Sequence, residues 1–345
     1  MRLAKIPPVS AAAIALTEDI EVIDLHLDSM IPRRIFGYDL NQRHRSGLGL
    51  FFGHLDFPRA IDSGLTGAMW SITTNPFRPA SARWQAFLNN LQDLKGLVEG
   101  SENRVQLVRN HSDWVRIRNE GSHGCMVAIQ GGNALQDAPQ GVRSIPEDLV
   151  TRVTLVHLTN SVYGATSSPL ALGRRAMPLS SVGKSLIEQL NDSRVFVDLA
   201  HIAERPFWDA VEVHDKSQPL IVTHTGVKGV KPHWRNLSDE QIRAVADTGG
   251  VVGVMLQKSF LQRAGGPKDV GMVIEHIEHI AKVAGVHSVA LGTDYDGAIV
   301  PPADLRDGSA PVRIVDALLR RGWSEGDIRN VMALNFLRSF KELRP

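Results

Sequence analysis

Short apolar runs that alternate with helical patterns constrain the fold of this chain more than any other feature. The runs cover residues 21–26, 67–73, 126–131, 152–158, 194–201, 220–224, 251–257 and 288–294, and a weaker run covers 104–109. Amphipathic helical patterns lie between most of them and are clearest at 180–192, 238–250 and 270–285. Ser238 followed by Gln241 has the spacing of a capping box at a helix start. Apolar strands that alternate with amphipathic helices predict a parallel sheet covered by helices.

The eight strong runs predict an α/β fold in which the strands close into a (β/α)8 TIM barrel. Such a barrel usually takes about 250 residues, and this chain has 345. We assign the surplus to a long connection after the first strand, over 29–66, and to a C-terminal helical tail. The sequence has no internal repeat, no low-complexity segment and no linker, so we expect one domain over residues 1–345.

Composition excludes several classes of protein. A net charge of +1 with dispersed lysine and arginine gives no basic stripe for nucleic acid. A single cysteine, Cys125, excludes an intramolecular disulfide and a cysteine-based zinc site. The apolar stretch near the start is shorter than the ~7–15 residues of a secretory core, and no run approaches the ~18 apolar residues of a membrane span. We therefore expect a cytoplasmic protein without a membrane or nucleic-acid partner.

Polar side chains stand at or just after the carboxyl ends of the predicted strands. They are His26, Asp28, Gln130, His157, His201, His224 and Asp294. In a barrel these strand ends meet at one face, where active sites form. Histidines and carboxylates that converge there make the donor set of a divalent metal site, with nitrogen and oxygen ligands that suit zinc.

Each of these residues also has a purely structural interpretation. His26 and Asp28 share one face of a strand by its period of two, and such a pair is common in ordinary strands. His201 and His224 follow apolar runs, where buried hydrogen-bonded histidines are frequent. The segment 294–297 ends in Asp-Gly, a typical turn pair. Their joint position at strand ends favours the metal site over these alternatives.

The segments that carry these residues also match a known family along nearly the whole chain. They include DLHLDSM (24–30), IQGGNAL (129–135), VTHTGVK (222–228) and LGTDYDG (291–297), and further matches cover 53–71, 154–164, 197–204 and 233–242. Together they resemble the renal (membrane) dipeptidases, metallopeptidase family M19, among the amidohydrolase-like barrels. The resemblance implies a two-zinc (β/α)8 hydrolase that cleaves dipeptides, often with a D-residue at the C-terminal side. It also implies, by analogy only, a homodimer.

Carried over by position, the resemblance implies roles for the metal ligands. His26 and Asp28 would hold one metal, and His201 and His224 would hold the other. Gln130 occupies the position that would bridge the two.

The resemblance also implies three residues that act on the substrate. Asp294 would handle protons while metal-activated water attacks the amide carbonyl. His157 would contact the substrate and stabilise the oxyanion. Arg235 would bind the terminal carboxylate, for which its planar guanidinium is well shaped, although it could instead be a surface arginine at a helix entry.

Gln130 departs from the family pattern, which carries a bridging glutamate at this position. A carboxylate has two anionic oxygens, whereas an amide has one neutral oxygen and an NH2 group that cannot bind a metal. Losing a unit charge ~4 Å from a cation forfeits about 4 kcal/mol at an effective dielectric near 20. We therefore expect weaker metal occupancy, with one tightly bound zinc rather than two. Met30, where the family usually has proline, is a second departure.

The sequence thus predicts a zinc-dependent dipeptidase-like hydrolase that acts on small dipeptide-like molecules and whose activity is weakened or altered by Gln130. Two alternatives remain open at this stage. One is an amidohydrolase-like enzyme for another small amide or a lactone, and the other is a catalytically silent homologue that binds a ligand.

Overall fold

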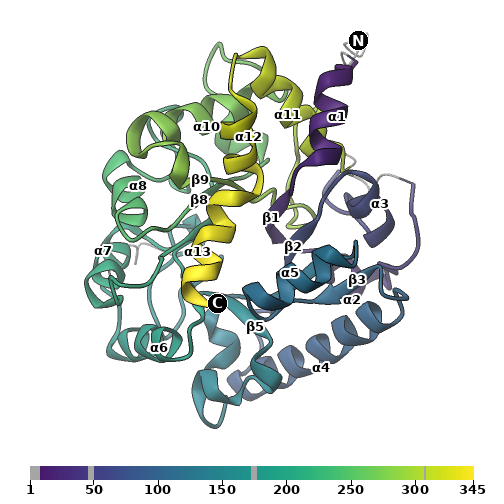
Figure 1. Ribbon diagram of the computed structural model, residues 1–345. Coiled ribbons are helices and arrows are strands. Elements are labelled where there is room, and N and C mark those ends of the chain that lie inside the picture. Colours follow the sequence, from purple (N-terminus) through teal and green to yellow (C-terminus); the bar gives the residue numbers. More distant parts are fainter. Residues whose placement is uncertain (1–7, 46–49, 172–176, 307) are drawn as a thin grey trace.

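Parallel strands form a ring surrounded by helices (Figure 1). The computed structural model describes residues 8–45, 50–171, 177–306 and 308–345. The strands are β1 (Ile23–Leu27), β2 (Gly67–Thr73), β3 (Val105–Leu107), β4 (His123–Gln130), β5 (Val150–Thr154), β6 (Phe196–Asp198), β7 (Val222–Thr225), β8 (Val252–Val254) and β9 (Val289–Leu291). Each strong apolar run of the sequence supplies one strand of the ring. The weaker run supplies β3, which pairs with β4 outside the ring.

The ring consists of two sheets that are joined at both seams. One sheet has the order β1-β2-β4-β5-β6, and the other has the order β7-β8-β9. A parallel bridge between Asp198 and Ile221 joins β6 to β7, and one between Leu27 and Tyr295 joins β1 to the segment after β9. Eight strands of the described chain therefore close into one parallel ring, which confirms the predicted (β/α)8 barrel.

Helices cover the outside of the ring. They are α1 (Ala11–Asp19), α2 (Met30–Phe36), α3 (Phe57–Asp62), α4 (Ala80–Glu99), α5 (His111–Asn119), α6 (Ser181–Asp192), α7 (Glu204–Val213), α8 (Asp239–Ala246), α9 (Lys258–Leu261), α10 (Gly271–Ala284), α11 (Ala310–Arg320), α12 (Glu325–Arg329) and α13 (Asn335–Leu343). The capping box predicted at Ser238 is present, with reciprocal hydrogen bonds to Gln241 at the start of α8. The long connection predicted over 29–66 contains the short helices α2 and α3, and its residues 46–49 lie outside the described chain.

The C-terminal helix α13 crosses one end of the ring (Figure 1). Its Phe336 and Phe340 lie 5.7 and 6.3 Å from the ring of Phe196, measured between centroids. These aromatic rings belong to one buried cluster with Leu25 and Met69, from strands of the barrel. The tail therefore plugs the amino ends of the strands and leaves their carboxyl ends to form the mouth of the barrel.

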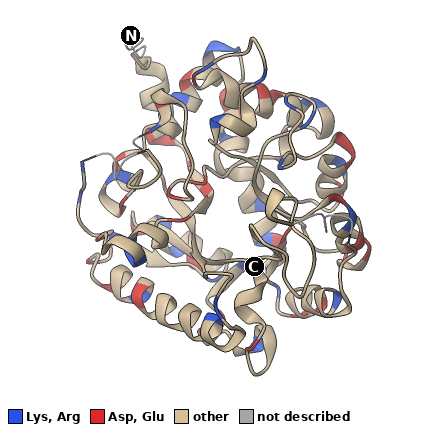
Figure 2. Cartoon of the chain, turned by 180° about the vertical axis from the view of Figure 1, so that it is seen from behind, with Lys and Arg blue, Asp and Glu red and all other residues tan. Residues whose placement is uncertain are grey.

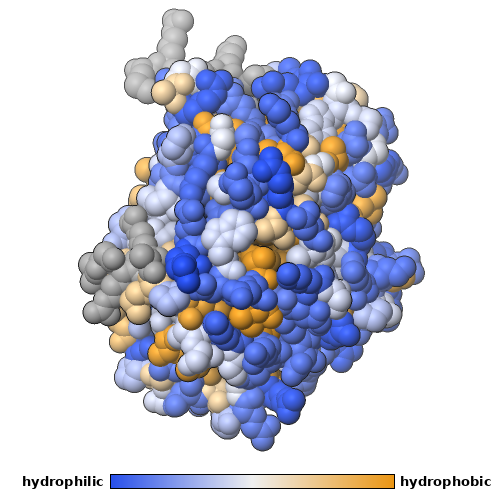
Figure 3. All heavy atoms as spheres, turned by 90° about the vertical axis from the view of Figure 1, so that its left-hand side faces the viewer, coloured by the Kyte–Doolittle hydropathy of each residue, from blue (hydrophilic) through white to orange (hydrophobic). Residues whose placement is uncertain are grey.

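The outer surface carries both signs of charge. Figure 2, seen from the side opposite Figure 1, shows acidic and basic residues spread around the outer helices. Figure 3 shows a face that is mostly hydrophilic, with small scattered apolar patches. Among the described helices, none combines the length and apolar character needed to cross a membrane.

Candidate metal centre

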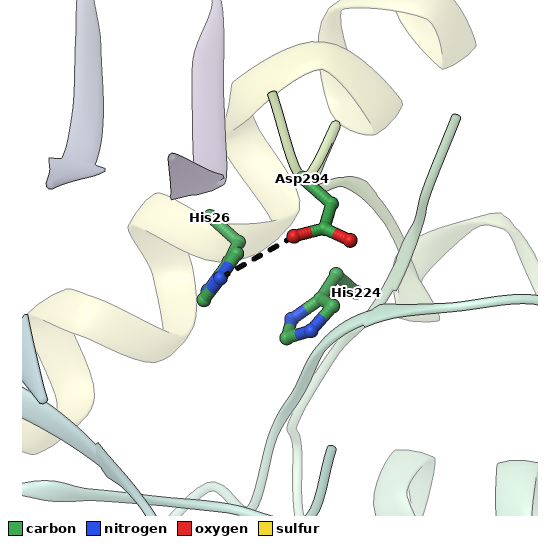
Figure 4. Close-up of side chains that lie close together, drawn as sticks. All are labelled: His26, His224 and Asp294. Carbon is green, nitrogen blue, oxygen red and sulfur yellow. Dashed lines mark ion pairs between the residues drawn. The ribbon is translucent and has the colours of Figure 1, made fainter. Parts of the chain in front are cut away.

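His26, His224 and Asp294 meet in the mouth of the barrel (Figure 4). One ligand atom from each lies within 4.8 Å of the others. The two imidazole rings stack with centroids 3.8 Å apart, and Nε2 of His26 lies 3.7 Å from Oδ1 of Asp294. All three side chains are buried. The group is a candidate site for a cation, built from three different strand ends.

The other residues expected at the strand ends border this group. Nε2 of His201 lies 2.8 Å from Nε2 of His224, and Oδ2 of Asp28 lies 3.5 Å from Nε2 of His26. The ring of His157 packs edge-on against that of His201, with centroids 4.7 Å apart. The fold thus brings the expected ligands into one mouth, although their positions along the chain are widely separated.

Gln130, the last residue of β4, reaches the same mouth with a buried amide. In the orientation that satisfies its neighbours, its nitrogen donates to both Asp28 oxygens, 2.8 and 3.0 Å away, and to Thr73 Oγ1 at 2.8 Å. Its oxygen accepts from Nε2 of His201 at 3.1 Å and lies 3.3 Å from Nε2 of His26. The hydroxyl of Thr73 in turn donates to Asp28. The amide therefore fills a position between the two expected metal sites with ordinary hydrogen bonds.

The Nδ1 atom of His224 is oriented by a hydroxyl relay. Thr223 Oγ1 lies 2.9 Å from this nitrogen and 2.7 Å from Oδ2 of Asp198. The single hydroxyl proton of Thr223 is donated to the Asp198 carboxylate, so its oxygen accepts a hydrogen bond from Nδ1–H of His224. This tautomer leaves a lone pair on Nε2 that faces the mouth, as a metal-binding histidine requires.

The Nδ1 atom of His26 contacts a hydrogen-bond donor, whereas Nδ1 of His224 contacts an acceptor. Nη2 of Arg152, from β5, lies 2.8 Å from it and also donates to Ser71 Oγ at 2.7 Å. Arg152 is fully buried, and its Nη1 contacts Thr154 Oγ1 at 2.5 Å and Asp198 at 3.4 Å. A guanidinium has only donors, so Nδ1 of His26 must accept. Sequence reasoning did not identify Arg152; the available signal was a charged residue inside an apolar run.

Burial sets the charge states in the mouth. It lowers the pKa values of His201 and His224 well below their ordinary value and lowers the pKa of His157 to about 4. These imidazoles are therefore neutral near pH 7, which metal ligation requires. Burial, together with the negative charge of Asp28, raises the pKa of Asp294 well above its ordinary value.

Two residues of the mouth have backbones in the left-handed region. His201 has φ of 66° and Asp294 has φ of 63°. A residue with a side chain adopts this conformation rarely, and such backbone strain gathers at functional sites. The neighbouring Gly131, which follows Gln130, has φ of 93°, where glycine avoids the same strain.

Arg235 lies beside the metal-site candidates and lines a cavity of about 560 Å³. Its side chain is buried, so the alternative of a surface arginine is wrong. Nη2 donates to the carbonyl oxygen of His224 at 2.6 Å, whereas Nε has no hydrogen-bond partner among the described residues. Burial lowers the pKa of Arg235 to about 10, which leaves it charged at neutral pH. His201, Trp208 and Trp234 also line the cavity.

Comparisons with known proteins support the same architecture. The family model of the membrane dipeptidases (peptidase family M19) matches residues 10–344. An uncharacterized protein in the pqqA 5′ region of Klebsiella pneumoniae is 28% identical over 274 residues, which cover 78% of this chain and 98% of that protein.

Solved structures with a similar fold include two metallopeptidases. One is the dipeptidase AC of family M19, with a TM-score of 0.82, 23% identity, and coverage of 94% of this chain and 98% of that chain. The other is a metallo peptidase from Rhodobacter sphaeroides liganded with a phosphinate mimic of the dipeptide L-Ala-D-Ala. It has a TM-score of 0.81 and 22% identity, and the match covers 94% of this chain and 99% of that chain. At these identities the structural likeness establishes the fold, and the family model adds the lineage: this chain belongs to the membrane dipeptidase family, peptidase family M19.

Proposed function

We propose that this protein is a zinc-dependent hydrolase of small dipeptides. The observation that carries the proposal is the open set of acceptors in the mouth, beside a buried arginine. The Nε2 lone pair of His224 and the carboxylate of Asp294 converge there, and Arg235 lies next to them with an unpaired Nε.

The donor set fits a divalent ion. His26, Asp28, His201, His224 and Asp294 are the residues available to hold it, and neutral imidazoles with carboxylates suit zinc. No hydrogen bond from the described residues reaches the carboxylate of Asp294, and Nδ1 of His201 is buried without a partner. Buried polar atoms are rarely left in this state unless a ligand or water completes them.

A divalent ion held there would supply Lewis acidity and lower the pKa of a water molecule toward neutrality. Asp294 is the residue placed to move the proton. Its raised pKa suits a group that accepts a proton from the attacking water and returns it to the leaving amine.

Two further side chains would recognise the dipeptide. His157 is neutral at pH 7 and can donate one N–H to the oxyanion that develops on the carbonyl. Arg235 can pair with the C-terminal carboxylate, because its Nε is free and its charge is retained. The cavity of about 560 Å³ beside it is of the size that accommodates a small ligand.

Gln130 is the reason to expect an altered enzyme. Its neutral amide replaces the bridging carboxylate of the family and is engaged with Asp28. We therefore propose weaker metal binding and a slower reaction than a bridging carboxylate would give.

Arg235→Met tests the substrate class. A panel of dipeptides that includes L-Ala-D-Ala would be assayed with added Zn2+. We expect Arg235→Met to raise KM on the order of 10- to 100-fold. This is the effect of losing one charge-assisted hydrogen bond, which contributes roughly 1.5–3 kcal/mol to binding. Arg205→Met is the matched control, because Arg205 lines the same cavity but is exposed. Its KM should remain near that of the wild type.

Metal content would be measured on every variant, because Arg235 also contacts the backbone of His224. An unchanged KM in Arg235→Met at equal metal content would contradict the dipeptidase proposal. Metal binding without turnover of any dipeptide would contradict it too, and would favour the ligand-binding alternative.

A further inference from the structure

We propose that the guanidinium of Arg152, which lies behind His26, excludes a metal cation from the half of the mouth formed by His26 and Asp28, so that the protein binds a single divalent ion in the other half. That other half consists of His201, His224 and Asp294. The inference deepens the proposed function and rests on it for the existence of a metal site.

The two stacked imidazoles carry their protons on different nitrogens. His224 donates a hydrogen bond from Nδ1–H to Thr223 Oγ1 and presents a lone pair on Nε2 to the mouth. His26 receives a hydrogen bond from Arg152 on Nδ1, 2.8 Å away, so in the neutral ring the proton is on Nε2. This Nε2–H faces the Gln130 oxygen, 3.3 Å away. A nitrogen that carries a proton cannot bind a metal, so His26 acts as a hydrogen-bond donor.

Asp28 is occupied by hydrogen bonds from the protein. Both of its oxygens accept from the NH2 group of Gln130, at 2.8 and 3.0 Å, and Oδ1 also accepts from Thr73. A bridging carboxylate in place of Gln130 would remove the two NH2 contacts and leave Asp28 Oδ2 free for a cation. Here the hydrogen-bonding capacity of Asp28 is filled by protein groups that a bound ion would have to displace.

Arg152 brings a buried positive charge to the mouth. Its side chain has 0% exposure and lies 3.4 Å from the equally buried Asp198, which balances part of this charge. Its positive charge therefore acts at short range through a medium of low dielectric. Two divalent ions would have to share the mouth with this charge and with that of Arg235, without the bridging carboxylate.

The opposite half is not fixed in this way, because no described residue forms a hydrogen bond with Nδ1 of His201. The proton that His201 Nε2 donates to Gln130 can therefore move to Nδ1 and leave Nε2 free for an ion. Asp294 receives no hydrogen bond from the described residues, and Nε2 of His224 carries a lone pair. The two halves thus differ. Protein donors fix the proton of His26 and fill Asp28. In the other half the His201 proton is not fixed, and the Asp294 carboxylate receives no hydrogen bond from the described residues.

Metal stoichiometry tests the proposal without reliance on activity. Metal-depleted protein would be titrated with Zn2+ by calorimetry, and the bound metal would be counted after desalting. We expect one equivalent for the wild type and still one for Gln130→Glu, because Arg152 remains. The double variant Gln130→Glu/Arg152→Met should bind two equivalents.

Two control variants separate charge from disturbance. Gln130→Glu/Arg152→Lys keeps a positive charge at the position and should bind one equivalent. Gln130→Glu/Arg344→Met removes another buried arginine, whose guanidinium contacts the backbone of Arg109 and Arg194 away from the mouth, and should also bind one. Two equivalents in the wild type, in Gln130→Glu or in either control would overturn the proposal, and so would one equivalent in a folded Gln130→Glu/Arg152→Met.

The protonation pattern of His26 provides a test that needs neither metal nor a stable Arg152 variant. Histidine 15N NMR of the metal-free wild type, with the signals assigned by His26→Gln and His224→Gln, should show protons on Nε2 of His26 and Nδ1 of His224. A proton on Nδ1 of His26 would refute the inference. Failure of the wild type to bind any zinc would contradict the proposed function, while this NMR measurement would still decide the role of Arg152.

Discussion

At the scale of single residues, the side chain that contacts Nδ1 of each histidine determines whether its Nε2 can bind an ion. His26 and His224 have the same side chain and stack 3.8 Å apart. The Thr223 hydroxyl accepts a hydrogen bond from Nδ1 of His224, whereas the Arg152 guanidinium donates one to Nδ1 of His26. Ligand identity alone therefore does not define a metal site in this barrel, because the neighbouring side chains choose the nitrogen that carries the proton.

The sequence pointed to the ligands but not to Arg152, for a physical reason. Polar residues at strand ends are recognisable because barrel geometry brings all strand ends to one face. Whether a residue within a strand points inward depends on register, and the pairing of β4 with β5 shifts between Val127 and Ala128. One such shift reverses the faces of a strand. The inward direction of Arg152 was therefore not available from its position in the run.

His123 lies at the other end of β4, far from the ligands, and makes stability depend on pH. Burial lowers its pKa from 6.5 to about 4, so the folded state binds fewer protons than the unfolded state between these values. Its contribution is present above pH 6.5 and is lost as the pH falls toward 4, by up to roughly 3 kcal/mol. The His123→Gln variant does not titrate here, and its amide can still donate to Leu65. We expect its unfolding free energy, measured in urea between pH 4 and 7, to depend less on pH. Identical pH dependence in both proteins would contradict the assignment.

At the scale of elements, the strands were easier to predict than the short helices. Strands of the ring stand out as apolar runs because helices cover their outer face and side chains fill their inner face. Helices α2 and α3 have seven and six residues, which is too short for a helical period to be visible. The long connection was consequently expected to be a loop, and its helices became apparent only in the structure.

Glycines allow the strands β7, β8 and β9 to approach closely. A Cβ atom added to Gly253 in β8, or to Gly292 just after β9, would overlap the backbone carbonyl oxygen of Thr223 in β7. A backbone atom cannot move aside as a flexible side chain can. Thr223 also orients His224, so this close packing supports the candidate metal site. A glycine in a strand signals such an approach, although the sequence does not name the partner.

We expect Gly253→Ala to lower the unfolding free energy by about 1–3 kcal/mol or more. This is the usual cost of an extra methyl group in a tightly packed core. Gly96→Ala is the matched control, because Gly96 lies on the exposed side of α4 with no atom near the added Cβ. It should stabilise the protein by about 0.5–1 kcal/mol through helix propensity. Urea unfolding of both variants provides the measurement, and equal effects of the two substitutions would refute the close-packing argument.

At the scale of the whole molecule, one end of the barrel is closed by a hydrophobic cluster and the other end holds the candidate metal site. The aromatic residues of α13 close the amino end, and the candidate metal residues gather at the carboxyl end. The sequence predicted a helical tail but did not show where it would pack. That position depends on the open end of the ring, which exists only once all strands have assembled.

Phe340→Ala tests this separation. Its aromatic ring is fully buried against the bottom of the barrel, so we expect a loss of about 3–5 kcal/mol in unfolding free energy. Metal stoichiometry under native conditions should stay the same. Phe77→Ala, at a side chain that is 84% exposed, should change stability by less than about 0.5 kcal/mol. A changed stoichiometry in folded Phe340→Ala would show that the two ends are coupled.

The seam between β1 and the segment after β9 has a consequence for synthesis on the ribosome. Thr293 donates to Asp24 across this seam, and the two residues are 269 positions apart in the chain. Translation proceeds at roughly 5–20 residues per second, so Thr293 is synthesised about 15 to 50 seconds after Asp24 in β1. During this interval one edge of β1 is unpaired and His26 has no Asp294 beside it. A nascent chain therefore lacks the complete group of His26, His224 and Asp294 until the segment after β9 has been made.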